Sequence, residues 1–145
     1  MKILFLSARN CCRSQIAEAI LRNMDKSLEI YSAGTDPAPE INPVAIDVMK
    51  EAGISVKPEK PANYSKYSHI EFDYLITVGD GTPEELKLPP VKYKRKMHLG
   101  FANPFKNSTD SRQIIENCRE IRDEIMVELD YFYHRILKPA IQAKH

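Results

Sequence analysis

The sequence predicts an α/β fold of three layers, in which a four-stranded parallel sheet carries helices on both faces. Short apolar runs alternate along the chain with longer segments whose apolar residues recur at helical spacing. Strands that alternate with helices imply right-handed crossovers, and such crossovers produce parallel sheets. We expect the four strands at residues 3–6, 28–33 and 73–78 and within residues 93–99.

The first strand, its loop and the first helix lie within residues 2–21. The apolar run of residues 3–6 is short and is followed at once by polar residues, as is typical of a buried strand. After the loop, apolar residues fall at helical spacing, and Ser14 is placed to cap the start of this helix. A strand, a tight polar loop and a helix aim backbone N–H groups and the helix dipole at one point. Arg13 adds a planar set of donors, so the loop is predicted to bind a tetrahedral oxyanion.

The later helices are also marked in the sequence. Asn42 is a predicted N-cap, Pro43 stands in the first turn and Gly53 lies just past the end of the second helix. Residues 57–68 form a polar surface loop or a short helix. Residues 109–137 form a long amphipathic helix with Cys118 in its apolar stripe, where we expect an ordinary core thiol.

A parallel sheet also predicts where the site lies. Ligands of such sheets bind beyond the carboxyl ends of the strands. The loop of residues 7–14, the loop after Val78 and the loop after Leu99 should therefore surround one pocket.

The loop SARNCCRS resembles the phosphate-binding loop of the low-molecular-weight protein tyrosine phosphatases and the related thioredoxin-coupled arsenate reductases. The family pattern is Cys-x-x-Asn-x-Cys-Arg-Ser, directly after the first strand. The similarity continues through residues 31–34, 42–45 and 73–77 and covers nearly the whole chain, 1–145, as one domain. It implies that the anion is bound by the whole loop, which comprises Ser7, Ala8, Arg9, Asn10, Cys11, Cys12, Arg13 and Ser14.

Two positions depart from the catalytic pattern of this family. Ser7 stands where the family has its nucleophilic cysteine, and a serine hydroxyl needs an adjacent general base. His69 and His98 could act as this base only if folding brought one of them next to Ser7, and neither has that role in the family. Asn103, before Pro104, stands where the family has its general-acid aspartate, and an amide has no titratable proton. The resemblance therefore implies that Ser7, Arg13 and Asn103 occupy the catalytic positions. Of these, Ser7 and Asn103 lack the chemistry of the family's nucleophile and general acid.

The thiols are a further departure. The reductase branch needs resolving cysteines after the third strand, but Gly79 holds the first position and no cysteine follows until Cys118. Arsenate reduction by that route is excluded on this reading. Cys12 matches the redox partner of the family nucleophile and, with serine at position 7, has no nearby thiol to pair with. Cys11 is an additional thiol, either inert or reactive with a low pKa beside positive charge.

Three more residues bear on the geometry and on metals. Arg9 replaces the usual glycine of the family, which puts the loop backbone in question. Asn10 is expected to adopt a left-handed conformation that supports the loop. With Glu18 and Ser32, Asn10 also matches part of a potassium site in the reductase branch. A structural or solvated role accounts for these residues equally well, so we expect no metal and no cofactor.

Composition limits the functional classes. The chain has 145 residues, three cysteines and a formal net charge of +1, so it resembles neither a disulfide scaffold nor a nucleic-acid-binding protein. The absence of a long apolar run and of a signal peptide leads us to expect a cytoplasmic monomer that does not enter membranes. The basic run of residues 92–96 is ordinarily a solvated face; the alternative is a surface that recruits an anionic partner or nucleic acid.

The function predicted from the sequence is binding of a phosphate-like oxyanion or a phosphorylated ligand, with catalysis impaired or absent. The alternative is an active protein tyrosine phosphatase, either with Ser7 as an engineered trap or with Cys11 as the nucleophile. A structural or interaction domain with an empty pocket is a third possibility.

Overall fold

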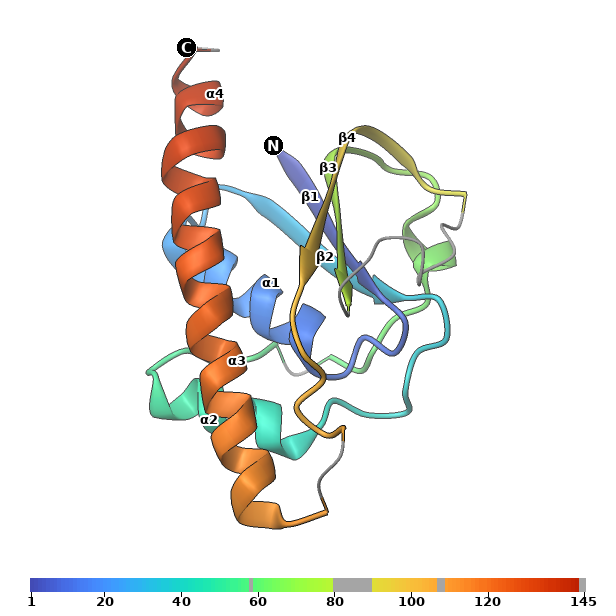
Figure 1. Cartoon of the computed structure of the whole chain (residues 1–145). Helices are drawn as coiled ribbons and strands as arrows, with labels where there is room; N and C mark the ends of the chain where they lie inside the picture. Colours follow the sequence, from blue (N-terminus) through green and yellow to red (C-terminus); the bar gives the residue numbers. More distant parts are fainter. Residues whose placement is uncertain (58, 80–89, 107–108, 144–145) are drawn as a thin grey trace.

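The computed structural model describes residues 1–57, 59–79, 90–106 and 109–143 (Figure 1). Its sheet has four parallel strands in the order β2-β1-β3-β4. The strands are β1 (Lys2–Ser7), β2 (Glu29–Gly34), β3 (Glu71–Gly79) and β4 (Lys92–Gly100). The predicted α/β class with a four-stranded parallel sheet is confirmed.

The described helices surround this sheet unevenly. They are α1 (Arg13–Met24), α2 (Pro43–Glu51), the 3-10 helix η1 (Tyr64–Tyr67) and α3 (Ser111–Phe132), which runs on through η3 (Tyr133–Leu137) into α4 (Lys138–Ala143). In Figure 1, α1 and the long α3 lie on the same side of the sheet, and α2 packs against α3. In the described chain, the opposite face is covered by η1 and its neighbouring residues.

Three strands extend past their predicted bounds because polar residues at their ends still pair, whereas β2 keeps its predicted length and is shifted by one residue. Ser7 pairs with Gly34, and Gly79 pairs with Gly100. The carboxyl ends of all four strands therefore reach the same edge of the sheet, which is where the loop of residues 7–14 begins. The predicted loop after Val78 falls largely on residues 80–89, outside the described residues.

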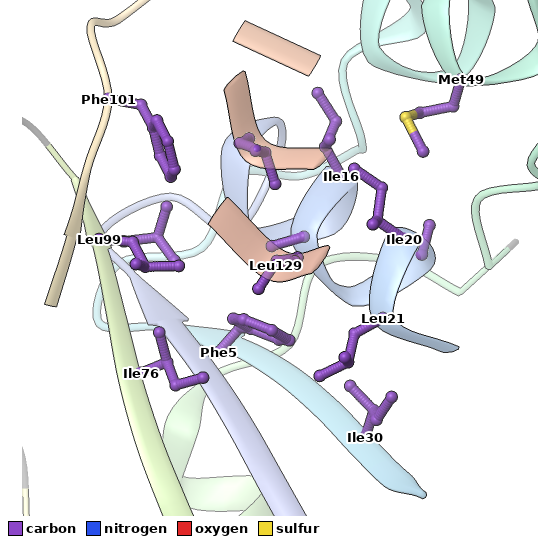
Figure 2. Close-up of a cluster of buried hydrophobic side chains, with 14 of the residues drawn as sticks. Phe5, Ile16, Ile20, Leu21, Ile30, Met49, Ile76, Leu99, Phe101 and Leu129 are labelled. Carbon is purple, nitrogen blue, oxygen red and sulfur yellow. The ribbon is translucent and has the colours of Figure 1, made fainter. Parts of the chain in front are cut away.

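The main core lies between the sheet and the helices α1 and α3 (Figure 2). Phe5 and Ile76 come from the central strands, Ile16 and Ile20 from α1, and Leu129 from α3. All five side chains are buried. The predicted apolar stripe of the last helix is confirmed for Cys118, Ile121, Ile125, Leu129 and Phe132, which are buried, while Ile114 and Ile136 are partly buried against the same core. A smaller cluster on the other face joins Leu4, Leu6 and Phe72 with Tyr64 and Tyr67 of η1.

The sequence signals of α2 are also confirmed. The Asn42 side chain accepts a hydrogen bond from the Val44 N–H at 2.9 Å, and Gly53 adopts a positive φ of 74° just past the helix. Among the described residues, no helix has the length and apolar run needed to cross a bilayer.

Candidate functional site: an anion-binding loop between β1 and α1

The loop between β1 and α1 is held by backbone hydrogen bonds to the chain that follows β2. The carbonyls of Ser7, Ala8, Arg9 and Cys11 accept bonds of 2.8–3.1 Å from the N–H groups of residues 35, 36, 38 and 42. Gly34 is needed for this close approach, because a Cβ there would lie 2.6 Å from Ala8 O. Four carbonyls of the loop are thereby turned toward this flanking segment.

The orientation of the carbonyls fixes the orientation of the amides. Across a planar trans peptide, a carbonyl and the next N–H point in opposite directions. The N–H groups of residues 8, 9, 10 and 12 therefore point away from the flanking segment, to the inner side of the loop. The Asn10 N–H confirms this for one of them, since it donates to Ser7 Oγ at 3.0 Å. Inward N–H groups are the donors that an oxyanion requires.

Asn10 shapes the loop from within, as predicted. It is the one residue other than glycine with a positive φ in the described chain, at 53°. Its side-chain Nδ2 donates to Ser14 Oγ at 3.0 Å, while its Oδ1 accepts from Ala62 N and Gln15 Nε2. Gln15 also donates to the Asn10 carbonyl. A buried network therefore holds the left-handed residue in place.

Ser14 does not cap α1, contrary to the sequence prediction. The helix begins one residue earlier, at Arg13, so the N-cap is Cys12, and Cys12 makes no side-chain capping bond. Ser14 lies inside the first turn, fully buried, and its hydroxyl is bonded to Ser7 Oγ at 2.8 Å and to Asn10. The first N–H groups of α1 thus lack a side-chain cap and remain suited to an anion.

A hollow of about 240 Å³ lies over this loop, lined by residues 7–13 together with Asn103, Pro104 and Phe105. Arg13 borders the hollow, and its guanidinium donates to the Phe101 carbonyl at 2.7 Å. This bond connects the loop with the chain after β4. The structure therefore brings together the predicted residues of the 7–14 loop and Asn103, except that buried Ser14 lies beneath the lining.

Asn103 has a structural role in the rim of the hollow. Its Oδ1 accepts a hydrogen bond from the Phe105 N–H at 3.0 Å, and its carbonyl accepts from Lys106 N. The Asn117 side chain of α3 fixes the same turn by donating to the Pro104 carbonyl at 3.1 Å. Asn103 is therefore the start of an Asx-type turn that closes one side of the hollow.

Arg9 does not disturb the loop. Its φ lies outside the left-handed region, so glycine is not required at this position. The guanidinium turns to the flanking segment, where it donates to Asp36 Oδ2 at 2.7 Å and to the Asp36 carbonyl at 2.9 Å. The pair is exposed and clamps the loop to the segment after β2.

The structure favours the inert alternative for Cys11 and corrects the expectation that Cys12 has no thiol neighbour. Burial raises the pKa of the Cys11 thiol, and this outweighs the opposing influence of Arg9 and Arg13, so Cys11 is not a low-pKa thiol. Cys12 does have a thiol neighbour, because its side chain is hydrogen-bonded to Cys118 of α3. That bond, together with burial, raises the pKa of Cys12 well above its ordinary value. No cysteine forms a disulfide in the described chain.

In the described chain, the hydrogen-bond partners of the Ser7 hydroxyl are groups other than the two candidate histidines, His69 and His98. This hydroxyl is bonded to the Ser14 hydroxyl and the Asn10 N–H, neither of which is a general base. The His98 ring instead lies on β4 and pairs its Nδ1 with Thr77 Oγ1 at 2.7 Å. His69 follows η1 and is exposed, away from the residues that line the hollow.

The residues matched to a potassium site have protein partners here. Buried Glu18 is paired with Arg22 one turn along α1 and accepts a hydrogen bond from Ser32 Oγ at 2.7 Å. The guanidinium of Arg22 thus supplies the positive charge that balances this carboxylate. Among the described residues, no group of three His, Cys, Asp or Glu side chains could hold a metal ion.

Sequence reasoning missed several residues that shape the site. Gln15 and Ala62 hold Asn10, the Phe101 carbonyl holds Arg13, and Cys118 contacts Cys12. Apart from Gln15, these partners lie far along the chain. A polar residue on the apolar face of α1, such as Gln15, is the one local signal that could have indicated a buried network.

Comparison with known proteins finds relatives that match most of this chain. The arsenate reductase of Shouchella clausii is 31% identical over 135 residues, covering 90% of this chain and 93% of that protein. The arsenate reductase of Bacillus subtilis is 29% identical over 131 residues, with the same coverage.

Two solved structures share the fold. An arsenate reductase in its phosphate-binding state superposes with a TM-score of 0.77 at 22% identity, over 93% of this chain and 98% of its own. The YwlE arginine phosphatase of Geobacillus stearothermophilus superposes with a TM-score of 0.74 at 23% identity, over 99% and 97%. The family described as low molecular weight phosphotyrosine protein phosphatase matches residues 2–140. The chain belongs to this family.

Proposed function

We propose that this protein binds a tetrahedral oxyanion, free phosphate or a phosphorylated ligand, in the loop of residues 7–14, and that it does not turn phosphomonoesters over by the cysteine route. The observation that carries the proposal is the arrangement of donors around one hollow. Inward N–H groups, an uncapped helix start and the Arg13 guanidinium converge there. These donors need no catalytic residue in order to bind an anion.

The proposed loss of turnover rests first on Ser7. The surrounding donors, the Asn10 N–H and the start of α1, would stabilise a thiolate. A serine hydroxyl has too high a pKa to ionise near neutrality by the same means, and its hydroxyl partner Ser14 cannot take its proton. Attack on phosphorus by Ser7 is therefore unassisted.

Asn103 supports the same proposal from the other side of the hollow. A leaving-group oxygen needs a proton, and an amide has none to give. The Asn103 carboxamide oxygen is also bonded to the Phe105 N–H. By family resemblance, position 103 holds the general acid. With Ser7 and Asn103 in place, the chain therefore lacks both the thiolate nucleophile and the general acid.

Arsenate reductase activity is the function that the named relatives suggest. We propose that this chain lacks it in thioredoxin-coupled form. Residues 80–117 contain no cysteine, so no resolving pair follows β3. The Cys12 and Cys118 thiols contact one another, but both are buried, out of reach of a docking reductant.

The test is calorimetric titration of the protein with inorganic phosphate, sulfate and arsenate. Arg13→Ala should weaken phosphate binding about tenfold or more, because a charge-assisted bond worth ~1.5–3 kcal/mol is removed. Arg135→Ala removes the same charge from an exposed position near the far end of the helical run and should leave binding unchanged. In parallel, the parent should show no phosphatase turnover and no thioredoxin-dependent arsenate reduction.

Two results would contradict the proposal. Phosphate affinity that is equal in the parent and in Arg13→Ala would place the anion outside this loop. Turnover of an aryl phosphate by the parent, abolished by Cys11→Ala, would identify Cys11 as a nucleophile and make the protein an active phosphatase.

A further inference from the structure

The edge strand β4 carries a basic surface that the anion-binding loop does not use. Four of the five residues 92–96 are lysine or arginine, and all five are exposed. β4 pairs with β3 along one side and is the last strand of the sheet in the described residues. Its outer edge therefore presents backbone N–H and C=O groups next to a row of cations.

Two of these cations are spaced as neighbours on one face of a strand. Side chains alternate along a β-strand, so Lys94 and Lys96, two residues apart, lie about 6.6 Å from one another along β4. Lys94 has an acidic neighbour, Asp73 of β3, at 3.5 Å, although the lysine side chain is still 60% exposed. An added strand with a carboxylate at every second residue would match this row.

A second copy of this chain is not expected to pair with the outer edge of β4. Antiparallel pairing of two β4 strands centred on Lys94 would place Lys92 opposite Lys96 and Lys94 opposite itself. Like charges directly across a strand pair are destabilising. The basic residues therefore oppose self-association by this edge.

Nucleic acid is also a poor occupant, because the neighbouring surface is acidic. Beside the carboxyl end of β4 lies a groove of about 610 Å³, between residues 98–101 and α3. Its α3 wall presents Asp123, Glu124 and Glu128 around the exposed Val127. A polyanion that tracked along β4 would meet these carboxylates, whereas a short acidic segment followed by uncharged or basic residues would not.

We propose that the outer edge of β4 docks an extended acidic segment of a partner protein as a fifth strand. The segment carries carboxylates at alternate positions opposite Lys94 and Lys96, and its backbone pairs with the side of β4 that no described strand covers. The part of the segment that passes the groove at α3 is uncharged or basic. This surface is separate from the anion-binding loop, although β4 leads into the Asn103 turn.

The probe is a short fluorescent peptide that alternates glutamate with threonine, and its binding is followed by anisotropy. The parent should bind it, more weakly as salt is raised. Lys94→Glu combined with Lys96→Glu should weaken binding about tenfold or more, since attraction becomes repulsion at two positions. Lys26→Glu with Lys138→Glu makes the same charge change at exposed sites elsewhere and should change binding less than about twofold.

Two further comparisons separate strand addition from charge attraction. A peptide with every threonine replaced by proline keeps its carboxylates but loses strand-forming N–H groups, so it should not bind. Calorimetric phosphate binding should be the same in the β4 variants as in the parent, which separates this surface from the loop. No binding by the parent, equal binding of the proline peptide, equal weakening by the Lys26 and Lys138 changes, or tighter binding of a single-stranded oligonucleotide would each overturn the proposal.

Discussion

Asn10 shows how a single residue sets the geometry of the loop. Its left-handed backbone turns the chain, and each of its side-chain polar groups is bonded to another part of the loop or its flank. Asparagine tolerates this conformation better than most residues, because its short polar side chain can bond locally. The N–H of the same residue then donates to the Ser7 hydroxyl, at the start of the loop.

At the same scale, we expect Ser7→Cys to give the protein measurable hydrolysis of activated aryl phosphates. The new thiol would lie next to the Ser14 hydroxyl, the Asn10 N–H and the start of α1, all of which stabilise a thiolate. Esters with poor leaving groups should gain much less, since general acid catalysis typically supplies ~10²–10⁴-fold. Initial rates on a series of esters with graded leaving groups measure this.

Adding Asn103→Asp to the Ser7→Cys variant should restore general acid catalysis and so raise the rate on esters with poor leaving groups. Aspartate keeps an oxygen that can accept from the Phe105 N–H, so the turn over the hollow is retained. Asn103→Ala in the same Ser7→Cys background is the matched control and should bring no gain. If Ser7→Cys alone hydrolysed esters with poor leaving groups as fast as the double variant, the general acid would have to lie at a position other than 103.

Cys11 gives a prediction about pH. Burial raises the pKa of its thiol, so at neutral pH the thiolate fraction is below that of a free thiol. Alkylation by iodoacetamide should therefore be slower at Cys11 than at glutathione near pH 7, and its rate should keep rising to higher pH than the glutathione rate does. Mass spectrometry with site assignment follows the reaction. A midpoint below that of glutathione would mean that Arg9 and Arg13 dominate over burial.

At the scale of elements, α1 differs from α2 and α3 in how it begins. Asn42 and Asp110 cap α2 and α3 with side-chain oxygens, whereas Cys12 offers α1 no such bond. A helix start without a cap costs stability unless water or a ligand satisfies its N–H groups. The uncapped start of α1 is therefore consistent with an anion site at that position.

The cap of α2 can be tested directly. Asn42→Ala should lower the free energy of unfolding by about 1 kcal/mol, because the Val44 N–H loses its acceptor. Asn42→Asp keeps an acceptor and should cost much less. Urea unfolding followed by circular dichroism compares the variants. Equal losses for alanine and aspartate would show that the side chain stabilises the protein by something other than capping.

At the scale of the whole molecule, one core connects the sheet with α1 and α3. Leu129 of α3 is fully buried in the same cluster as Phe5 of β1 and Ile16 of α1 (Figure 2). The contact between Cys12 and Cys118 joins the end of the loop to α3 in this cluster. The site therefore depends on α3, although α3 contributes no residue to the lining of the hollow.

We expect Leu129→Ala to lower the free energy of unfolding by ~2–5 kcal/mol, since it leaves a cavity in this core. Val127→Ala, two residues away at a position that is 69% exposed, should change it by less than about 0.5 kcal/mol. Chemical denaturation, fitted with one m-value for all proteins, measures the free energy of unfolding of both variants. Similar costs for the two variants would mean that α3 does not pack on the sheet through the face described above.

The sequence by itself determined the parts of this protein that depend on local pattern. Apolar runs located β1 and β3, helical spacing located the buried face of α3, and Asn42 with Gly53 marked the ends of α2. The short motif of residues 7–14 was enough to predict an anion loop, and its binding stays a prediction. Each of these signals arises from neighbours a few residues apart, through backbone geometry and side-chain periodicity.

Only the tertiary structure decided how the site is held. Arg13 is fixed by the Phe101 carbonyl 88 residues away, Asn10 by the Ala62 N–H 52 residues away, and Cys12 meets the thiol of Cys118. Ser14 carries the residue type of a cap, yet the helix begins before it, because the buried bonds to Ser7 and Asn10 take its hydroxyl. The contacts with Phe101, Ala62 and Cys118 follow from strand order and helix packing, which no local pattern encodes.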